Sequence, residues 1–262
     1  MDTGLKGKVA LIAASSEGIG KAAAEAFAAE GARLAICSRS MQKLNAAAQD
    51  LHMRYHAELM PRTVDVRDSN SITAFVDSAV QQFGRIDVLV TNSGGPPAKP
   101  FLALSDEEWK NGVDLCLMSH VYFCRAAIPH MQKQNSGSII MISSLVVRQP
   151  DHALALSSSI RPATLGLVRS LANEFGKDGI RVNAIGPGYT MTSRQEELAN
   201  TRAEASGKSP DEIKAGWSAD VPLGRTAQPQ EIADAILWLG SNRSSYVTGQ
   251  TIIVDGGKWK GV

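Results

Sequence analysis

Short apolar segments recur along the chain and alternate with amphipathic ones. The first, KVALIAA (8–14), has no polar alternation, which is typical of a strand buried on both faces of a sheet. We predict strands at 8–14, 33–38, 58–66, 87–92, 138–144 and 180–188. The intervening segments predict helices at 20–32, 41–55, 69–83 and 105–134, and a further helix that ends at Phe175.

This alternation predicts one α/β domain. Strands that alternate with helices form βαβ units with right-handed crossovers, and such units build a parallel sheet covered by helices on both faces. No break divides residues 1–262, so we expect a single doubly wound domain. The segment 190–220 differs, because it is polar, weakly periodic and follows a strand at the edge where ligands bind. We interpret it as a mobile lid over a pocket, or else as a solvated helical hairpin without a function.

Charge and cysteine content narrow the class of protein. Lys and Arg number 27 and Asp and Glu 26, a formal net charge of +1, so nothing favours a nucleic acid or a membrane surface as partner. No long apolar window predicts a membrane span, and the N-terminus does not resemble a secretory signal. Cys37, Cys116 and Cys124 are an odd set without framework spacing, so we expect reduced thiols in a cytoplasmic protein.

The turn after the first predicted strand is a candidate phosphate site. In ASSEGIG (14–20), Gly18 and Gly20 let the backbone approach a ligand where a helix begins. The start of a helix offers free N–H groups and the positive end of its dipole to a phosphate. A GxG turn also occurs at helix starts that bind nothing, so the neighbouring residues must decide.

The end of the second predicted strand favours NADP over NAD. Ser38 stands where a carboxylate would bind a ribose 2′-hydroxyl, and Arg39 beside it suits a 2′-phosphate. Glu17 argues the other way, since a basic residue there would have helped to bind that phosphate.

Several motifs then follow one another in one order: SSEGIG (15–20), DV (65–66), NSG (92–94), ISS (142–144), RVNAIGPGYTMT (181–192) and VTGQTIIVDGG (247–257). This order resembles the short-chain dehydrogenase/reductase family, and the 3-oxoacyl-carrier-protein reductases in particular. The resemblance implies one Rossmann-type domain with a seven-stranded parallel sheet. It also implies a nicotinamide cofactor, a small carbonyl or alcohol substrate, and a homodimer or homotetramer.

The resemblance further implies which residues hold the cofactor. They are Ser15, Ser16 and Ile19 for the pyrophosphate and ribose, Asp65 and Val66 for the adenine, Asn92 and Gly94 for the adenosine ribose side, and Pro187, Gly188 and Thr192 for the nicotinamide carboxamide and phosphates. The family's first glycine of the Gly-rich turn is Ala14 here. Because a methyl is poorly tolerated in the left-handed region, we expect Ala14 to have a negative φ.

The reaction centre departs further from the family's pattern. That pattern is a serine, a tyrosine four residues before a lysine, and an asparagine on the preceding helix. The family's spacing from Ser144, and a count back from RSLA (169–172), both place Ser157 at the tyrosine position and Arg161 at the lysine position. The asparagine position is Cys116. The resemblance therefore implies a divergent subgroup without the Tyr-x-x-x-Lys pair.

This replacement leaves the source of the proton open. A serine hydroxyl is a far weaker acid than a phenol, and Arg161 stays charged and cannot relay a proton. Arg161 can still bind ribose hydroxyls or a phosphate and stabilise a developing alkoxide. Three hypotheses follow: hydride transfer in which Ser144 and Ser157 bond the substrate oxygen and water supplies the proton, hydride transfer with His152 as the acid, or a nucleotide-binding protein that has lost the chemistry.

Other histidines and a tyrosine are further candidates for chemistry. His52 and His56 lie at i and i+4, but no third ligand follows and we predict no metal site. His120, one turn after Cys116, is interpreted as an interface histidine or a satisfied core histidine. Tyr189 is the tyrosine expected near the cofactor; the resemblance implies packing as its main role, and a role as substitute acid is the alternative.

Overall fold

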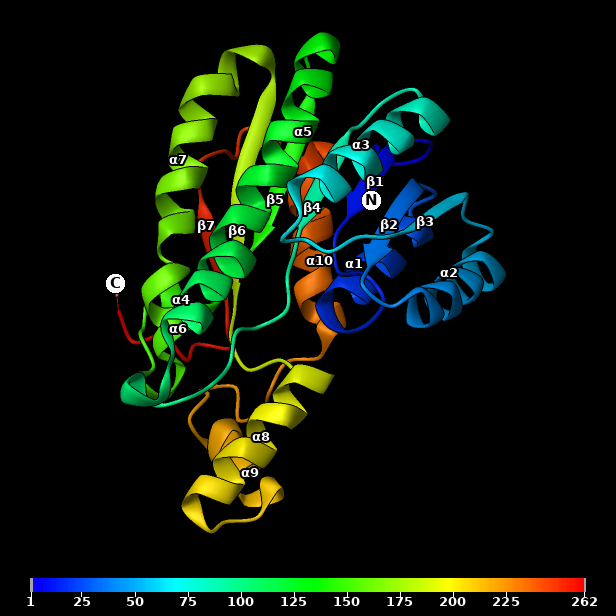
Figure 1. Ribbon diagram of the computed structural model, residues 1–262. Coiled ribbons are helices and arrows are strands. Elements are labelled where there is room, and N and C mark those ends of the chain that lie inside the picture. Colours follow the sequence, from blue (N-terminus) through cyan, green and yellow to red (C-terminus); the bar gives the residue numbers. More distant parts are fainter. Residues whose placement is uncertain (1, 262) are drawn as a thin grey trace.

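The sheet is the frame of the molecule. The computed structural model describes residues 2–261, which contain seven parallel strands in the order β3-β2-β1-β4-β5-β6-β7 (Figure 1). The strands are β1 (Val9–Ile12), β2 (Arg33–Ser38), β3 (Leu59–Thr63), β4 (Val88–Thr91), β5 (Gly137–Ile142), β6 (Ile180–Pro187) and β7 (Thr251–Val254). Strand β1 lies between β2 and β4 and pairs with both, so Leu11 lies opposite Ala35 and Leu89. Chain order reverses at this strand, and such a switch point opens a crevice at the carboxyl ends of the strands.

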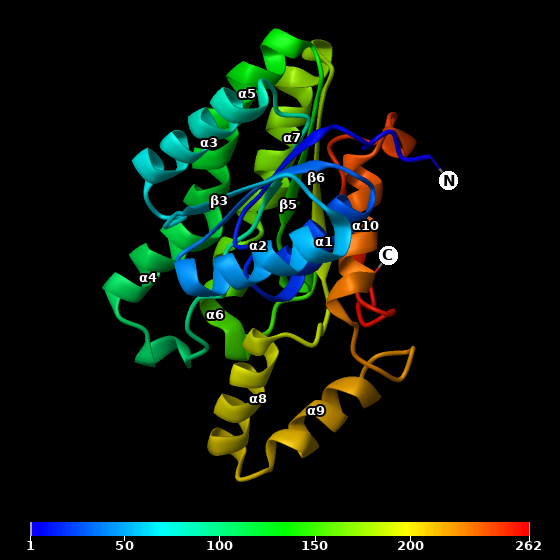
Figure 2. The same ribbon diagram turned by 90° about the vertical axis from the view of Figure 1, so that its right-hand side faces the viewer.

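Helices cover both faces of the sheet, as predicted. One face carries α1 (Gly18–Ala29), α2 (Met41–Tyr55) and α10 (Pro229–Gly240). The other carries α3 (Ser69–Phe83), α5 (Ser119–Gln134) and α7 (Ala163–Phe175). Figures 1 and 2 show the two layers from directions at right angles.

Each face of the sheet has its own apolar core, and β1 contributes to both. Leu11 packs in the core that contains Phe123 of α5, whereas the next residue, Ile12, packs in the core that contains Phe27 of α1. Successive strand residues point to opposite faces, so both must be apolar where both faces are covered. This geometry explains the absence of polar alternation, and each such side chain contributes about 1.5–3 kcal/mol on burial.

Capping residues set the ends of the helices that the sequence predicted well. The Ser40 side chain accepts a hydrogen bond from the Lys43 amide at the start of α2. The Asp68 side chain accepts one from the Asn70 amide at the start of α3, which ends at Gly84 with φ +79°. These caps confirm the predicted spans 41–55 and 69–83.

Two predicted helices are interrupted. The span 105–134 consists of α4 (Asp106–Val113), a π-helical turn η2 (Asp114–Met118) and α5. The helix that ends at Phe175 is α7, and a shorter helix, α6 (Ala155–Ile160), precedes it. The break falls at Arg161 and Pro162, since proline has no N–H to donate and its ring crowds the preceding turn.

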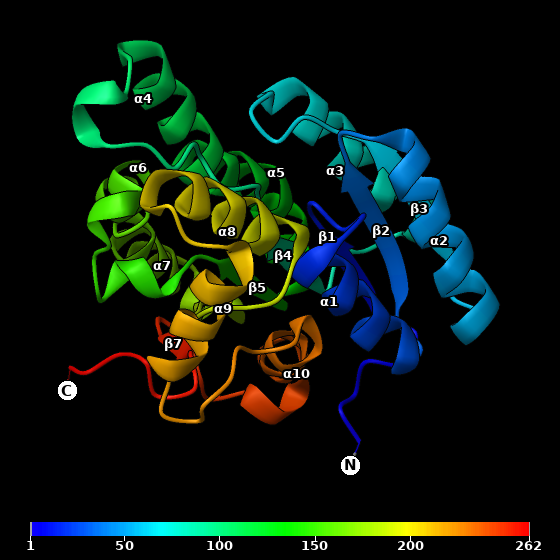
Figure 3. The ribbon, with the colours of Figure 1, turned by 90° about the horizontal axis from the view of Figure 1, so that it is seen from below.

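The polar segment 190–220 forms two helices beyond the carboxyl edge of the sheet. These are α8 (Ser193–Ser206) and α9 (Pro210–Ala219), which pack on each other (Figure 3). An ion pair of 2.6 Å between Arg202 and Asp151 ties α8 to the loop before α6. Whether this pair of helices moves as a lid stays a prediction. No helix in the described part of the chain is both long and apolar enough to cross a bilayer.

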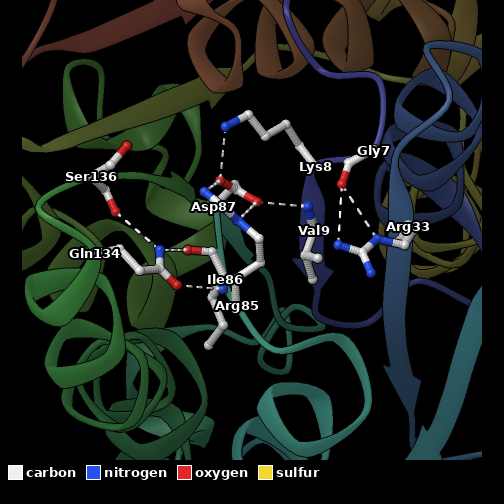
Figure 4. A network of polar contacts seen from close by, with 9 residues as sticks. All are labelled: Gly7, Lys8, Val9, Arg33, Arg85, Ile86, Asp87, Gln134 and Ser136. Carbon is white, nitrogen blue, oxygen red and sulfur yellow. Dashed lines mark hydrogen bonds and ion pairs between the residues drawn. The ribbon is translucent and has the colours of Figure 1, made fainter.

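A buried carboxylate, Asp87, lies at the opposite, amino edge of the sheet and is fully paired. Asp87 accepts hydrogen bonds from the Val9 amide at 2.9 Å and from Arg85 at 2.6 Å, and Lys8 lies 3.3 Å from it (Figure 4). These contacts join the start of β1 to the start of β4.

Candidate functional site

A cavity of about 880 Å³ lies at the carboxyl edge, between the strand ends and α8. Most residues that the sequence assigned to a site line this cavity: Ser16, Gly18, Ile19, Ser38, Arg39, Val66, Asn92, Gly94, Ser144, Ser157, Arg161, Pro187, Gly188 and Thr192. They come from six separate segments of the chain, which the parallel sheet brings to one edge.

Three predicted cofactor residues do not line the cavity, and the structure gives each another contact. The Ser15 hydroxyl donates to the Ile12 carbonyl at 3.0 Å and accepts from the Cys37 amide at 3.1 Å, which joins β1 to β2. A side chain at Gly20 would collide with the Ala14 carbonyl. The Asp65 carboxylate is paired with Arg67 at 2.7 Å. Their roles in cofactor binding stay predictions.

Ala14 corrects one expectation. Its φ is +49°, in the left-handed region, whereas the sequence led us to expect a negative value. The turn from β1 into α1 needs this conformation because the chain must reverse within a few residues, and the methyl does not prevent it. An L-residue in this region costs roughly 1–2 kcal/mol relative to the right-handed one.

Within residues 2–261, no side chain caps the start of α1. Glu17 occupies the N-cap of α1 without a side-chain cap, and its carboxylate instead pairs with Lys43 at 3.0 Å. Thr192 faces this turn, since a Cβ added to Gly18 would lie 3.3 Å from its methyl group. Unfilled N–H groups at a helix start attract an anion.

The end of β2 presents a cation and no acid. Ser38 is buried, and its hydroxyl donates to the Ser40 carbonyl at 3.0 Å. Arg39 is exposed and makes no ion pair or side-chain hydrogen bond with any of residues 2–261.

The predicted reaction residues gather at the other end of the cavity. Ser144 follows β5, and its hydroxyl accepts from the Val146 amide at 3.3 Å. Ser157, in α6, is 9% exposed, and Arg161 is 7% exposed. The Arg161 guanidinium donates long hydrogen bonds of 3.5 Å to the carbonyls of Ser143 and Gly94.

The buried Arg161 has no carboxylate partner among the described residues, and its neighbours do not offer a proton. Burial, and after it the charge of Arg161, lowers the pKa of His120 to about 3. The His120 Nδ1 atom bonds the Thr91 hydroxyl at 2.6 Å, but its buried Nε2 has no partner in the part of the chain described. The interpretation of His120 as a satisfied core histidine is therefore only half correct. Burial also raises the pKa of the Cys116 thiol, which lies on the π-helical turn.

A sequence profile described as enoyl-(acyl carrier protein) reductase matches residues 13–258, nearly the whole chain. The chain belongs to the short-chain dehydrogenase/reductase family. This short-chain dehydrogenase/reductase is 35% identical to the 3-oxoacyl-[acyl-carrier-protein] reductase FabG of Chlamydia muridarum, over 98% of this chain and 99% of that protein.

Two solved structures extend the comparison. The L-sorbose reductase of Gluconobacter frateurii, complexed with NADPH and L-sorbose, has 33% identity and a TM-score of 0.95, with 100% of both chains covered. A short chain oxidoreductase of Pseudomonas aeruginosa PAO1, bound to NADPH and described as containing an atypical catalytic centre, has 32% identity and a TM-score of 0.87. It matches over 97% of this chain and 98% of its own.

Two further candidate proton donors line the cavity of this reductase-family member. His152 is exposed at the start of a short 3-10 helix, η4 (His152–Leu154). The Tyr189 ring stacks on Trp217 of α9 with 5.2 Å between centroids, and the Lys258 Nζ atom lies 5.8 Å from the centroid of the Tyr189 ring. This stacking agrees with the packing role expected for Tyr189. No cluster of metal-ligating side chains occurs within residues 2–261.

Two polar residues of the cavity were missed by sequence reasoning. Arg194 donates a 2.5 Å hydrogen bond to the Pro96 carbonyl, and Gln195 beside it has a buried, unpartnered amide nitrogen within the chain described. Both lie in the segment read as a lid. The sequence shows that both residues are polar. It contains no local pattern that predicts a contact between this segment and the loop at Pro96, about a hundred residues earlier.

Proposed function

We propose that this protein is an NADPH-dependent reductase of carbonyl compounds whose reaction centre is Ser144, Ser157 and Arg161. It would thus belong to a divergent subgroup that lacks the Tyr-x-x-x-Lys pair. The observation that carries the proposal is that these three side chains line one cavity and that Arg161 is buried there with no carboxylate partner in residues 2–261. A buried cation of this kind suits an oxygen that becomes negative during the reaction.

The residues present fit the dinucleotide. The free N–H groups before α1, together with Ser16, Gly18 and Thr192, would hold the pyrophosphate. The unpaired Arg39, with no acid at Ser38, would hold a 2′-phosphate, which favours NADP over NAD. When bound, NADPH supplies a hydride, that is, two electrons and the hydrogen that goes to the carbonyl carbon.

The chain's own groups would then stabilise the other half of the reaction. The hydroxyls of Ser144 and Ser157 donate hydrogen bonds to the carbonyl oxygen, which orients the carbonyl. As the C=O double bond opens, the guanidinium of Arg161 stabilises the charge on that oxygen, and a water molecule protonates it to give the alcohol. We assign the proton to water because the hydroxide that it leaves can exchange with the solvent, whereas a serine alkoxide or a neutral guanidine would remain in the site.

Two relatives support this proposal. The sorbose reductase was solved with NADPH and a sugar, and the Pseudomonas oxidoreductase binds NADPH with a catalytic centre described as atypical. Both resemble this chain over nearly its full length, so a nicotinamide cofactor in the same cavity is the natural expectation.

The test combines cofactor binding with turnover. NADPH binding is measured by tryptophan fluorescence, and NADPH oxidation is followed with a panel of ketones, β-ketoacyl thioesters and quinones. We expect Ser144→Ala, Ser157→Ala and Arg161→Gln each to lower kcat/KM by about 10²–10³-fold, the usual loss for one group that stabilises an oxyanion. Ser159→Ala is the matched control, because Ser159 is exposed on the same helix and does not line the cavity.

Two results would contradict the proposal. Turnover that survives the triple variant would exclude this reaction centre. Tight NADPH binding by the wild type without reduction of any carbonyl would favour a nucleotide-binding protein that has lost the chemistry. In that case Ser157→Tyr combined with Arg161→Lys tests whether the rest of the pocket still supports reduction.

A further inference from the structure

Two guanidinium groups converge on one loop of the cavity. Arg161, between α6 and α7, donates to the Gly94 carbonyl at 3.5 Å, and Arg194, in α8, donates to the Pro96 carbonyl at 2.5 Å. A Cβ added to Gly95, between these two carbonyls, would lie 2.7 Å from Arg194 Nε. The two cations therefore reach the same short segment from two separate parts of the chain.

Within the described residues, Arg161 has no acid to neutralise it, and Arg194 is paired only with an acid outside the cavity. Arg161 has no acidic partner within ion-pair distance among residues 2–261, and the one ion pair of Arg194 is with Glu197, whose side chain is 66% exposed. The acidic side chains that line the cavity are already engaged: Glu17 with Lys43, Glu108 with Lys99 and Asp151 with Arg202. Positive charge at this end of the cavity is thus in excess of what the chain itself balances.

A third donor lines the same cavity. Gln195 lines the cavity next to Arg194, and its Nε2 atom is buried without a hydrogen-bond partner in the described part of the molecule. Buried donors are nearly always paired in native proteins, so an unpartnered one in a cavity indicates a ligand atom that accepts from it. Two guanidinium groups and an amide N–H₂ together suit an anion with several acceptor oxygens.

We propose that the substrate is an oxo acid, a carbonyl compound whose carboxylate is held by Arg194 and Gln195 near Arg161. This inference rests on the proposed function, and it assigns Arg194 a role in specificity rather than in the reaction. The carboxylate of the substrate would lie beside the Gly94–Pro96 loop. The two features assigned to the phosphates of the cofactor, the turn before α1 and Arg39, lie at the nucleotide end of the cavity.

The experiment compares each acid with its neutral ester. The probes are pyruvate against methyl pyruvate and acetoacetate against ethyl acetoacetate, with kcat/KM measured for the wild type, Arg194→Met and Arg194→Lys. We expect the wild type to prefer the acids and Arg194→Met to lower the acid-to-ester ratio of kcat/KM by about 10–100-fold, the value of a charge-assisted hydrogen bond. Arg194→Lys, which keeps the charge, should recover part of the ratio. Arg62→Met is the matched control, because Arg62 is exposed on β3 and lies outside the cavity.

Binding measurements separate this inference from the proposed function and from the cofactor. Calorimetric titration of acetoacetate into the wild type with NADP⁺ should give binding that Arg194→Met loses and that ethyl acetoacetate does not show, even if turnover is absent. Equal use of acid and ester by the wild type, or no binding of either acid, overturns the inference. So does a loss of NADPH affinity in Arg194→Met, which would assign Arg194 to a phosphate of the cofactor instead.

Discussion

Replacing Ala14 by glycine should make the protein more stable. Ala14 has φ +49°, a conformation that costs an L-residue roughly 1–2 kcal/mol but costs glycine almost nothing. Glycine loses more conformational entropy on folding, about 0.5–1 kcal/mol relative to alanine. The difference predicts that Ala14→Gly raises the free energy of unfolding by about 0–1.5 kcal/mol, with a midpoint of about 0.75 kcal/mol.

The neighbouring position provides a control of opposite sign. Ala13 is fully buried and does not have a positive φ, so Ala13→Gly relieves no strain. Ala13→Gly removes a buried methyl group, whose burial contributes about 0.8 kcal/mol. It also adds the same entropic cost of glycine on folding, so it should lower the free energy of unfolding by about 1–2 kcal/mol. Two identical substitutions at adjacent positions should therefore shift stability in opposite directions.

Urea unfolding followed by tryptophan fluorescence, without cofactor, measures both effects. For a chain of this length, a gain of 1 kcal/mol corresponds to a rise in Tm of about 2–4 °C, so calorimetry can check the sign. If Ala14→Gly destabilises as much as Ala13→Gly does, the left-handed turn at Ala14 is wrong, and with it the close approach of α1 to the end of β1.

Further predictions concern the two edges of the sheet. Arg39→Met should raise the Kd for NADPH by about 10–100-fold and leave NADH binding within about twofold, as measured by fluorescence titration, because in our proposal this cation binds the phosphate that only NADPH carries. An equal loss of affinity for NADPH and NADH would show that Arg39 does not bind the 2′-phosphate. Burial alone raises the pKa of Asp87, but the hydrogen bonds from Arg85 and the Val9 amide and the charges of Lys8 and Arg85 outweigh it, so the net pKa is lowered. This carboxylate therefore stabilises the fold above the unfolded pKa, near 4, and the contribution is lost as the pH falls through the lower folded pKa. Asp87→Asn should cost roughly 1–3 kcal/mol at pH 7 and should flatten the dependence of stability on pH in acid, and an unchanged acid profile would contradict this.

The sequence predicted those parts of the fold whose signals are local. β2, α2 and α3 were predicted with their observed bounds, because Ser40 and Asp68 cap the helices and Gly84 ends one of them. The parallel sheet followed from the alternation of apolar and amphipathic segments. Most residues of the cavity were found through the resemblance, since the order of the motifs fixes which strand ends meet at one edge.

Features that depend on tertiary contact were not predicted. The left-handed φ of Ala14 depends on the close approach of α1 to the end of β1, which overrides the preference of alanine. Arg194 and Pro96 meet across 98 positions of sequence, and no pattern in either segment announces the contact. The missing partner of His120 Nε2 is a property of its surroundings rather than of the sequence around it.

Buried charge is paired at one edge of the sheet and unpaired at the other, and this difference is the strongest physical reason to place a ligand-binding site in the cavity. At the amino edge, Asp87 is satisfied by two cations and a backbone amide (Figure 4). At the carboxyl edge, Arg161 is buried at 7% exposure without an acid in residues 2–261, and Ala14 holds an unfavourable backbone conformation. Unpaired buried charge and backbone strain both lower stability, so they persist where function requires them. Both occur around one cavity of this molecule, and an anion bound near Arg161 would remove the larger of the two costs.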